Sequence, residues 1–148
     1  MENRFMAQAC REARKAFEED EVPVGCVIVK DGKIIARAHN RKEKKNCALF
    51  HAETVCIQKA ARKLNNWNLK GCEIYVTLEP CMMCTGALVN SRIDRIIYGC
   101  RDPKGGALVS NIRLQDVKLL NHYPEIQGGI MEEECSSLLK EFFKNKRK

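Results

Sequence analysis

Two short motifs in the sequence contain residue types that can bind a metal ion and move a proton. The first is His51-Ala52-Glu53, and the second, thirty residues after the histidine, is Pro80-Cys81-Met82-Met83-Cys84. Thiolates and an imidazole are ligands that zinc prefers, so His51, Cys81 and Cys84 can supply three of them. Zinc with three protein ligands keeps a fourth position for water, which is typical of a catalytic site.

The cysteine motif is expected to open a helix, because Pro80 suits a first turn, where its missing N–H costs nothing. Cys81 and Cys84 are three residues apart, so on a helix they project to the same side, one turn apart. In a first turn, the free backbone N–H groups and the helix dipole favour a thiolate. This placement therefore favours metal binding by both sulfur atoms.

Glu53 is the candidate proton carrier of this site. Two thiolates cancel the formal charge of Zn²⁺, so the metal acidifies its water less than a three-histidine site would. A nearby carboxylate must then accept the proton and later hand it to the substrate. Glu53 is two residues from His51 and can lie beside the metal without binding it. This H-x-E…P-C-x-x-C pattern is the signature of the zinc nucleobase deaminases.

Two other interpretations of these motifs stay open at this point. A C-x-x-C pair alone could be a redox pair or half of a structural zinc site. A closed structural site would need a fourth ligand, and Cys47 is the strongest candidate because it is four residues before His51. The other candidates for that fourth ligand are Cys56, Cys72 and His122.

The chain has nine cysteines, an odd number that cannot all pair within one chain. Six of them are expected to pack in the core as small apolar residues. They are Cys10, Cys26, Cys56, Cys72, Cys100 and Cys135. Reduced thiols, the mixed polar sequence at the N-terminus and the lack of a long apolar run argue against a secreted or membrane protein. We therefore expect a cytoplasmic protein.

The size and the apolar patterns predict one α/β domain over residues 1–148, with a mixed sheet between helical layers. Helices are expected over 5–17, over 51–64, from Pro80 onward, and in a C-terminal segment with an apolar face from Met131 to Phe142. Strands are expected over 22–29, 34–38, 74–78 and 93–99, and 117–120 is a candidate last strand. Asp31-Gly32 suits a two-residue hairpin turn between the first two strands.

The chain resembles the bacterial tRNA-specific adenosine deaminases over nearly its whole length. The matching segments are Glu21–Gly25, Asn40-Arg41, Thr77–Cys84, Ser91–Ile93, Gly99–Gly106, Asn121-His122, and the C-terminal run from Gly129-Ile130 through Glu134-Cys135 to Phe142-Phe143. The resemblance implies a three-layer α/β/α cytidine-deaminase-like fold, with a central mixed five-stranded sheet and helices on both faces. It also implies one zinc ion per subunit and a homodimer.

The resemblance further implies hydrolytic deamination of adenosine to inosine at the wobble position of an anticodon, typically that of a tRNA for arginine. Glu53 would act as the proton shuttle while zinc-bound hydroxide attacks C6 of adenine. Asn40 would contact the flipped nucleotide, and Val24 and Leu78 would line its pocket. Asp102 and Lys104 would lie in a loop near the ribose and backbone.

The formal charge is 26 − 19 = +7, which would help to bind the phosphates of an anticodon stem-loop. The cations concentrate in Arg41–Lys45 and in Lys144–Lys148, and Phe143 could stack on splayed loop bases. The simpler interpretation is a solvated loop and a helix end whose cations complement the dipole. Two other functions remain as alternatives: a metabolic deaminase of guanine, cytosine or cytidine, and a non-catalytic zinc protein that binds RNA.

Overall fold

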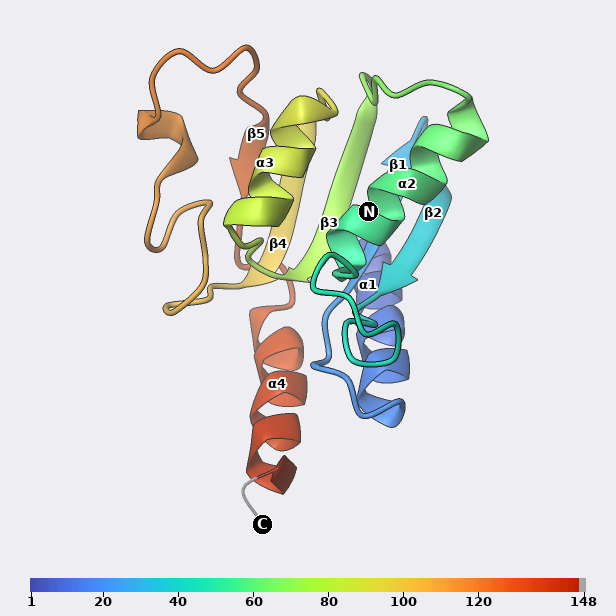
Figure 1. Ribbon diagram of the computed structural model, residues 1–148, viewed down its shortest axis with the longest axis vertical. Helices are drawn as coiled ribbons and strands as arrows, with labels where there is room; N and C mark the ends of the chain where they lie inside the picture. Colours follow the sequence, from blue (N-terminus) through green and yellow to red (C-terminus); the bar gives the residue numbers. More distant parts are fainter. Residues whose placement is uncertain (147–148) are drawn as a thin grey trace.

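The chain builds one five-stranded sheet with four α-helices, seen in a computed structural model that describes residues 1–146 (Figure 1). In chain order the elements are α1 (Glu2–Glu18), β1 (Gly25–Lys30), β2 (Lys33–His39), α2 (Ala52–Leu64), β3 (Cys72–Leu78), α3 (Met82–Asn90), β4 (Arg95–Cys100), the 3₁₀ turn η1 (Leu114–Asp116), β5 (Glu125–Gln127) and α4 (Glu132–Lys146). The strand order is β2-β1-β3-β4-β5. Strand β1 is antiparallel to both neighbours, whereas β3, β4 and β5 are parallel, so the sheet is mixed, as predicted.

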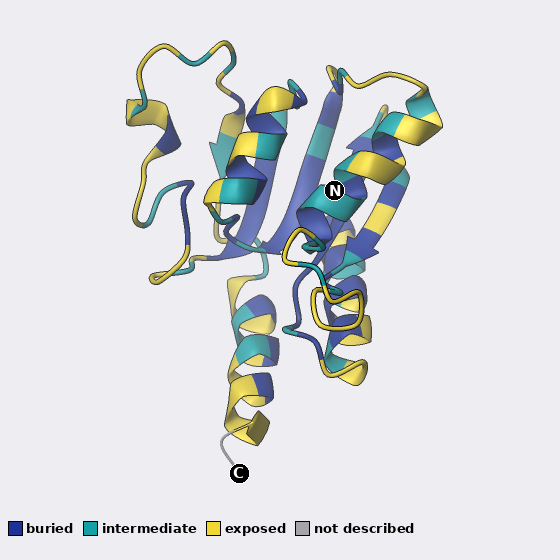
Figure 2. Cartoon of the chain, in the orientation of Figure 1, coloured by how far each residue is buried: buried dark blue, intermediate teal, exposed yellow. Residues whose placement is uncertain are grey.

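Helices cover both faces of the sheet, which confirms the predicted three layers. Alternate residues of β3 point to opposite faces: Ile74 and Val76 pack with the residues of α2 and α3, and Tyr75 packs with those of α1 and α4. Figure 2 shows the strands as a buried layer, while the helices are exposed on their outer sides. Helix α4 extends past the ends of the strands, beside the C-terminal half of α1 (Figure 1).

The segments that contain the candidate site residues meet at one end of the strands. Strands β3 and β4 end there together, since Leu78 pairs with Cys100. Strand β1 starts and strand β2 ends at this same end of the sheet, where Gly25 pairs with His39. The carboxyl ends of parallel strands are a common place for ligand sites, because loops and helix starts converge there.

The predicted last strand at 117–120 is wrong. Leu119 has a left-handed backbone (φ 64°) and is 97% exposed, which is incompatible with a strand in this sheet. The last strand is instead β5, whose three residues include a single apolar side chain, Ile126. So short a strand carries too little alternation to be visible in the sequence.

Several element boundaries also differ from the predictions by one to three residues. Helix α3 begins at Met82 with Cys81 as its N-cap, so Pro80 precedes the helix instead of occupying its first turn. Strand β1 begins at Gly25, because residues 22–24 have an irregular backbone before the sheet.

The cysteine prediction holds for the core. Cys26, Cys56, Cys72, Cys100 and Cys135 are buried, and Cys10 is half-buried with its sulfur 3.6 Å from that of Cys135. All nine cysteines lie within the described residues, and none of them is in a disulfide bond. Within residues 1–146, no helix combines the length and the apolar character that crossing a bilayer requires.

Candidate metal centre and substrate pocket

The starts of two helices bring His51, Cys81 and Cys84 together. His51 is the N-cap of α2 and Cys81 is the N-cap of α3, and both have an extended backbone that turns the side chain off the helix axis. Cys84 follows one turn into α3. The Nδ1 atom of His51 lies 3.7 Å from the sulfur of Cys81 and 3.5 Å from that of Cys84. The three ligand atoms all lie within 4.8 Å of one another.

The electrostatics of this group favour a bound cation. Hydrogen bonds with Cys84 and, to a lesser extent, with His51 lower the pKa of Cys81 to about 4, although burial acts in the opposite direction. The pKa of Cys84 is raised, because this sulfur holds the proton that the pair shares and is also buried. Cys81 is thus a thiolate at neutral pH, and its hydrogen bond with His51 raises the pKa of that ring. Two sulfurs and a ring nitrogen at this spacing fit zinc, which displaces the shared proton when it binds.

A fourth protein ligand is not part of this group: among residues 1–146, no other histidine, cysteine, aspartate or glutamate places a ligand atom within the same 4.8 Å cluster. Three of the residues considered as fourth ligands are engaged elsewhere. Cys56 contacts the carbonyl oxygen of Cys26, His122 bonds to that of Ile93, and Cys72 begins β3 at the far end of the strand. Cys47 is half-buried in the loop before α2. The arrangement favours an open coordination site over a closed one.

Glu53 lies in the first turn of α2 with only 4% of its surface exposed. Burial raises the pKa of its carboxyl to about 7, because the charged form loses its hydration. The nearby sulfur of Cys81 raises this pKa as well, while His51 lowers it. A carboxyl with a pKa near neutrality can both accept and donate a proton at physiological pH.

A cavity of about 180 Å³ opens at this centre. It is lined by most of the residues predicted to take part in metal binding, proton transfer and substrate binding, together with Val22, Lys42, Ala52 and Glu79. The predicted residues on its wall are Val24, Asn40, His51, Glu53, Leu78, Cys81 and Asp102. Val24 and Leu78 contribute apolar surface to the wall, as binding of a base would require.

Asn40 is held in place at this cavity by its own loop. Its side-chain Nδ2 donates to the carbonyl of Val22 at 3.2 Å, and its Oδ1 accepts from the backbone N–H of Lys42 at 3.2 Å. Its backbone N–H donates to Val24. Asn40 is 8% exposed, so its position is set before any substrate arrives.

Two predicted substrate contacts lie outside the cavity. Lys104 is exposed on the loop after β4, where Asp102 Oδ1 accepts hydrogen bonds from the backbone of Lys104 and Gly105. Phe143 lies on α4, 45% exposed, and lines a separate hollow with Arg101, Lys140 and Lys144. Because Arg101 and Asp102 are consecutive, this hollow and the cavity adjoin along the chain.

The sequence patterns assign no role to Glu79, which lines the cavity from the end of β3. Its buried carboxylate accepts hydrogen bonds from the backbone of Asp102, Leu108, Val109 and Ser110. Burial alone would raise the pKa of Glu79, but the hydrogen bonds from Ser110 and the backbone outweigh it and lower that pKa. The signal in the sequence that could have identified Glu79 is its position, as a charged residue between an apolar strand and Pro80.

Comparison with known proteins agrees with this geometry. Residues 1–147 match the family model described as MafB19-like deaminase. Proteins named tRNA-specific adenosine deaminase are 45% identical in Bacillus subtilis (strain 168) and 49% identical in Aquifex aeolicus (strain VF5). Each alignment covers 97% of this chain, with 89% of the first relative and 94% of the second.

Solved structures give the same picture. One from a study of A-to-I editing by tRNA:A34 deaminases at the wobble position of transfer RNA is 44% identical, with a TM-score of 0.89 over 92% of this chain and 99% of that one. A guanine deaminase from Nitrosomonas europaea has a TM-score of 0.78 at 21% identity, covering 95% of this chain and 83% of that one, which shows a shared fold alone.

Proposed function

Because this chain belongs to the family of tRNA-specific adenosine deaminases, we propose that it converts adenosine to inosine at the wobble position of a tRNA anticodon, with a tRNA for arginine as the expected substrate. The observation that carries this proposal is the cavity itself. It brings the metal-binding group, the carboxyl of Glu53 and the side chain of Asn40 to one place, as deamination of a flipped base requires.

The cofactor that fits is one zinc ion per subunit, held by His51, Cys81 and Cys84. When bound, zinc supplies an activated water molecule for attack on C6 of the adenine ring. One of the two sulfurs is already a thiolate before the metal arrives, and the other keeps its proton. Binding therefore requires the release of that proton from the cysteine pair.

Glu53 is the residue proposed to move protons. In its charged form it takes a proton from the attacking water, and in its neutral form it returns that proton to N1 of adenine. It then helps the 6-amino group to leave as ammonia when the C6–N bond breaks. Its pKa of about 7 suits these steps. Asn40 binds the nucleotide through its amide, while Val24 and Leu78 hold the base between apolar surfaces. Asp102 and Lys104 act on the ribose and phosphate side.

The surface beside the cavity suits RNA better than a free base. Phe143 offers an exposed aromatic ring, and three cations share its hollow: Arg101, Lys140 and Lys144. An aromatic ring between cations can stack a base while the cations bind phosphates. The basic loop at 41–45 reaches the cavity through Lys42, and its Lys44 lines a further hollow together with Phe143. Of the predicted C-terminal cations, Arg147 and Lys148 lie outside the described residues.

We place this activity in a single deaminase domain over 1–148 that works as a cytoplasmic homodimer. Exposed apolar side chains support self-association: Met82 on α3 is 67% exposed beside an apolar hollow of Val89, Ile112, Val117 and Leu120. A second subunit would cover this surface.

The test is to incubate the zinc-loaded protein separately with an adenosine-bearing anticodon stem-loop, with free guanine and with cytidine, and to measure the ammonia released. The proposal expects release from the stem-loop and not from the two small substrates. The stem-loop product should contain inosine at the wobble position by mass spectrometry. Release from guanine or cytidine with an inert stem-loop would instead establish a metabolic deaminase.

A further inference from the structure

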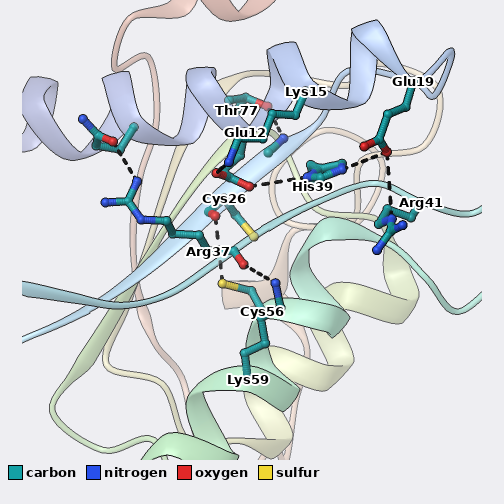
Figure 3. Close-up of polar contacts among 12 residues, drawn as sticks. Glu12, Lys15, Glu19, Cys26, Arg37, His39, Arg41, Cys56, Lys59 and Thr77 are labelled. Carbon is teal, nitrogen blue, oxygen red and sulfur yellow. Dashed lines mark hydrogen bonds and ion pairs between the residues drawn. The ribbon is translucent and has the colours of Figure 1, made fainter.

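The imidazole of His39 lies between two carboxylates at the end of β2 (Figure 3). Its Nδ1 is 3.4 Å from Glu12 in α1, and its Nε2 is 3.0 Å from Glu19 at the C-cap of the same helix. The His39 side chain is 14% exposed, and that of Glu12 is 5% exposed. Both ring nitrogens can donate only when the imidazole is protonated. His39 can therefore donate to both Glu12 and Glu19 only when its imidazole is cationic.

This contact lies where α1 packs tightly on the sheet. Gly25, the partner of His39 in the β1–β2 register, has no room for a side chain, because a Cβ atom there would come within 2.7 Å of the Glu12 Cβ and still closer to the α1 backbone. Glu12 is thus pressed against the strand pair. Lys15, at 2.7 Å, and His39 supply the charges that balance its carboxylate.

The next two residues lead into the substrate cavity. Asn40 follows His39 directly and lines the cavity wall. Arg41 then turns back toward α1, with its Nε 3.9 Å from the same Glu19 oxygen that His39 contacts. Glu19 therefore contacts the chain on both sides of Asn40, through a hydrogen bond with His39 and a longer charge–charge contact with Arg41, both drawn as dashed lines in Figure 3.

We infer that His39 is a positioning residue for the deamination: by bridging Glu12 and Glu19 it fixes the end of β2 and, with Arg41, holds Asn40 in its substrate-binding position. The inference rests on the proposed function, since it assigns Asn40 to the substrate. His39 does not line the cavity, so it acts through its neighbour and not by touching the base.

The surrounding charges favour the cationic form of the bridge. The hydrogen bond to Glu12 raises the pKa of His39 above its ordinary 6.5, and burial, which acts the other way, does not cancel this effect. Burial raises the pKa of Glu12, but hydrogen bonds from His39 and Lys15 outweigh it and lower that pKa to about 2. The hydrogen bond from His39 also lowers the pKa of Glu19, which Lys44 and Arg41 face. Both carboxylates therefore stay ionised while His39 titrates.

When His39 loses its proton, one ring nitrogen becomes an acceptor that faces a carboxylate, so one of the two bridging bonds breaks. The experiment measures KM and kcat for the anticodon stem-loop from about pH 6 to about pH 9, in wild type and in His39→Gln. In wild type, KM is expected to rise by roughly 10-fold as pH increases through the raised pKa, since one charge-assisted hydrogen bond is removed. His39→Gln is expected to show the high KM at every pH, with the wild-type pH dependence of kcat.

Two matched variants separate this role from general folding effects. His122→Gln removes the other histidine outside the metal group, and its KM should rise with pH as the wild-type KM does. Gln8→Ala removes a 2.7 Å bond to Arg37 between the same helix and the same strand, and its KM should also rise in this way. Trypsin cleavage after Arg41, Lys42, Lys44 or Lys45, measured at pH 7, should be faster in His39→Gln than in Gln8→Ala.

A rise of KM with pH that persists in His39→Gln would overturn the inference. So would a KM of His39→Gln that equals the wild-type KM at low pH. Equal cleavage of the loop in the two variants would overturn it as well. The proposed function is judged separately, because it fails only if wild type itself releases no ammonia from the stem-loop. Zinc content, measured in each variant, should stay at one ion per subunit.

Discussion

The carboxylate of Glu79 accepts hydrogen bonds from both the backbone N–H and the hydroxyl of Ser110, a residue 31 positions further along the chain. The same carboxylate accepts from the backbone of Leu108 at 3.1 Å and of Val109 at 2.8 Å. Gly106 packs so tightly here that a Cβ atom would collide with the Glu79 carboxyl and lie 2.6 Å from the Asp102 carbonyl. One buried side chain thus fixes the loop that brings Asp102 to the cavity.

Glu79→Gln should loosen this loop, because the amide nitrogen of glutamine would face backbone N–H donors that the carboxylate now accepts. We expect the free energy of unfolding to fall by about 1–3 kcal/mol, the cost of leaving buried donors unpaired. KM for the stem-loop should rise more than kcat falls. Urea unfolding and steady-state kinetics measure the two effects.

Glu73→Gln is the matched control for that change, since Glu73 is the second residue of β3, at the end of the strand far from Glu79, and its side chain is 30% exposed. It should leave KM unchanged. If Glu79→Gln has wild-type KM and stability, the carboxylate does not hold the loop.

Glu53→Gln should bind zinc as wild type does, because Glu53 is not among the metal-binding group. Its amide cannot accept the proton from water, so kcat should fall by at least about 100-fold, the contribution of a general acid–base group. Metal analysis and ammonia release from the stem-loop are the two measurements. Activity within a few-fold of wild type would remove Glu53 from the proposed mechanism.

The number of metal ligands can be tested by comparing two cysteine variants. Cys81→Ala removes one of the three clustered ligand atoms and should lose zinc on dialysis, whereas Cys47→Ala should keep one ion per subunit. Zinc content after dialysis, measured by mass spectrometry, distinguishes them. Metal loss from Cys47→Ala would instead show a closed structural site.

The His39 bridge also predicts how stability changes with pH. The pKa of His39 is raised in the folded protein, so the stabilisation is fully present below the ordinary pKa of 6.5 and is lost as pH rises through the higher folded value. Wild type should therefore exceed His39→Gln in stability by about 1 kcal/mol near pH 6 and by less near pH 9. Urea unfolding at both pH values, with zinc present, measures the difference. A gap that widens toward high pH would contradict the assignment of charge to the bridge.

The sequence was sufficient to predict the elements around the metal group, because each had a local signal. Cysteines three apart, a following apolar helix and the His-x-Glu pair all act within one or two turns. The composition of Ile74–Leu78 likewise predicted a strand, and the structure shows that this strand is buried on both faces. These patterns need no knowledge of distant contacts.

Long-range contacts account for what the sequence did not reveal. Glu79 and Ser110 meet only after β3 and the loop beyond β4 are placed side by side. Glu12 and His39 are 27 residues apart and meet because α1 packs onto β1 at Gly25. Strand β5 depends on pairing with β4, since its own three residues have no strand pattern. No local rule predicts any of these pairings.

The hollow around Phe143 makes a prediction about salt. Arg101, Lys140 and Lys144 line the same hollow as Phe143, and each cation that binds a phosphate releases counterions when RNA binds. Changing these three residues to Gln should reduce the slope of log K against log salt by about 1 for each phosphate that is no longer neutralised.

Phe143→Ala separates stacking from charge at the same place. It should weaken binding by about 1–3 kcal/mol if a base stacks on the ring, with the slope unchanged because no cation is removed. Lys118→Gln, an exposed lysine on the loop before β5, serves as the control and should alter neither affinity nor slope. Fluorescence titration of the stem-loop at several salt concentrations gives both quantities.

Because Lys146 is already paired with Asp20 at 2.7 Å, Lys146→Gln should change the slope less than Lys144→Gln does. Equal slopes for wild type and the triple variant would show that RNA does not reach α4.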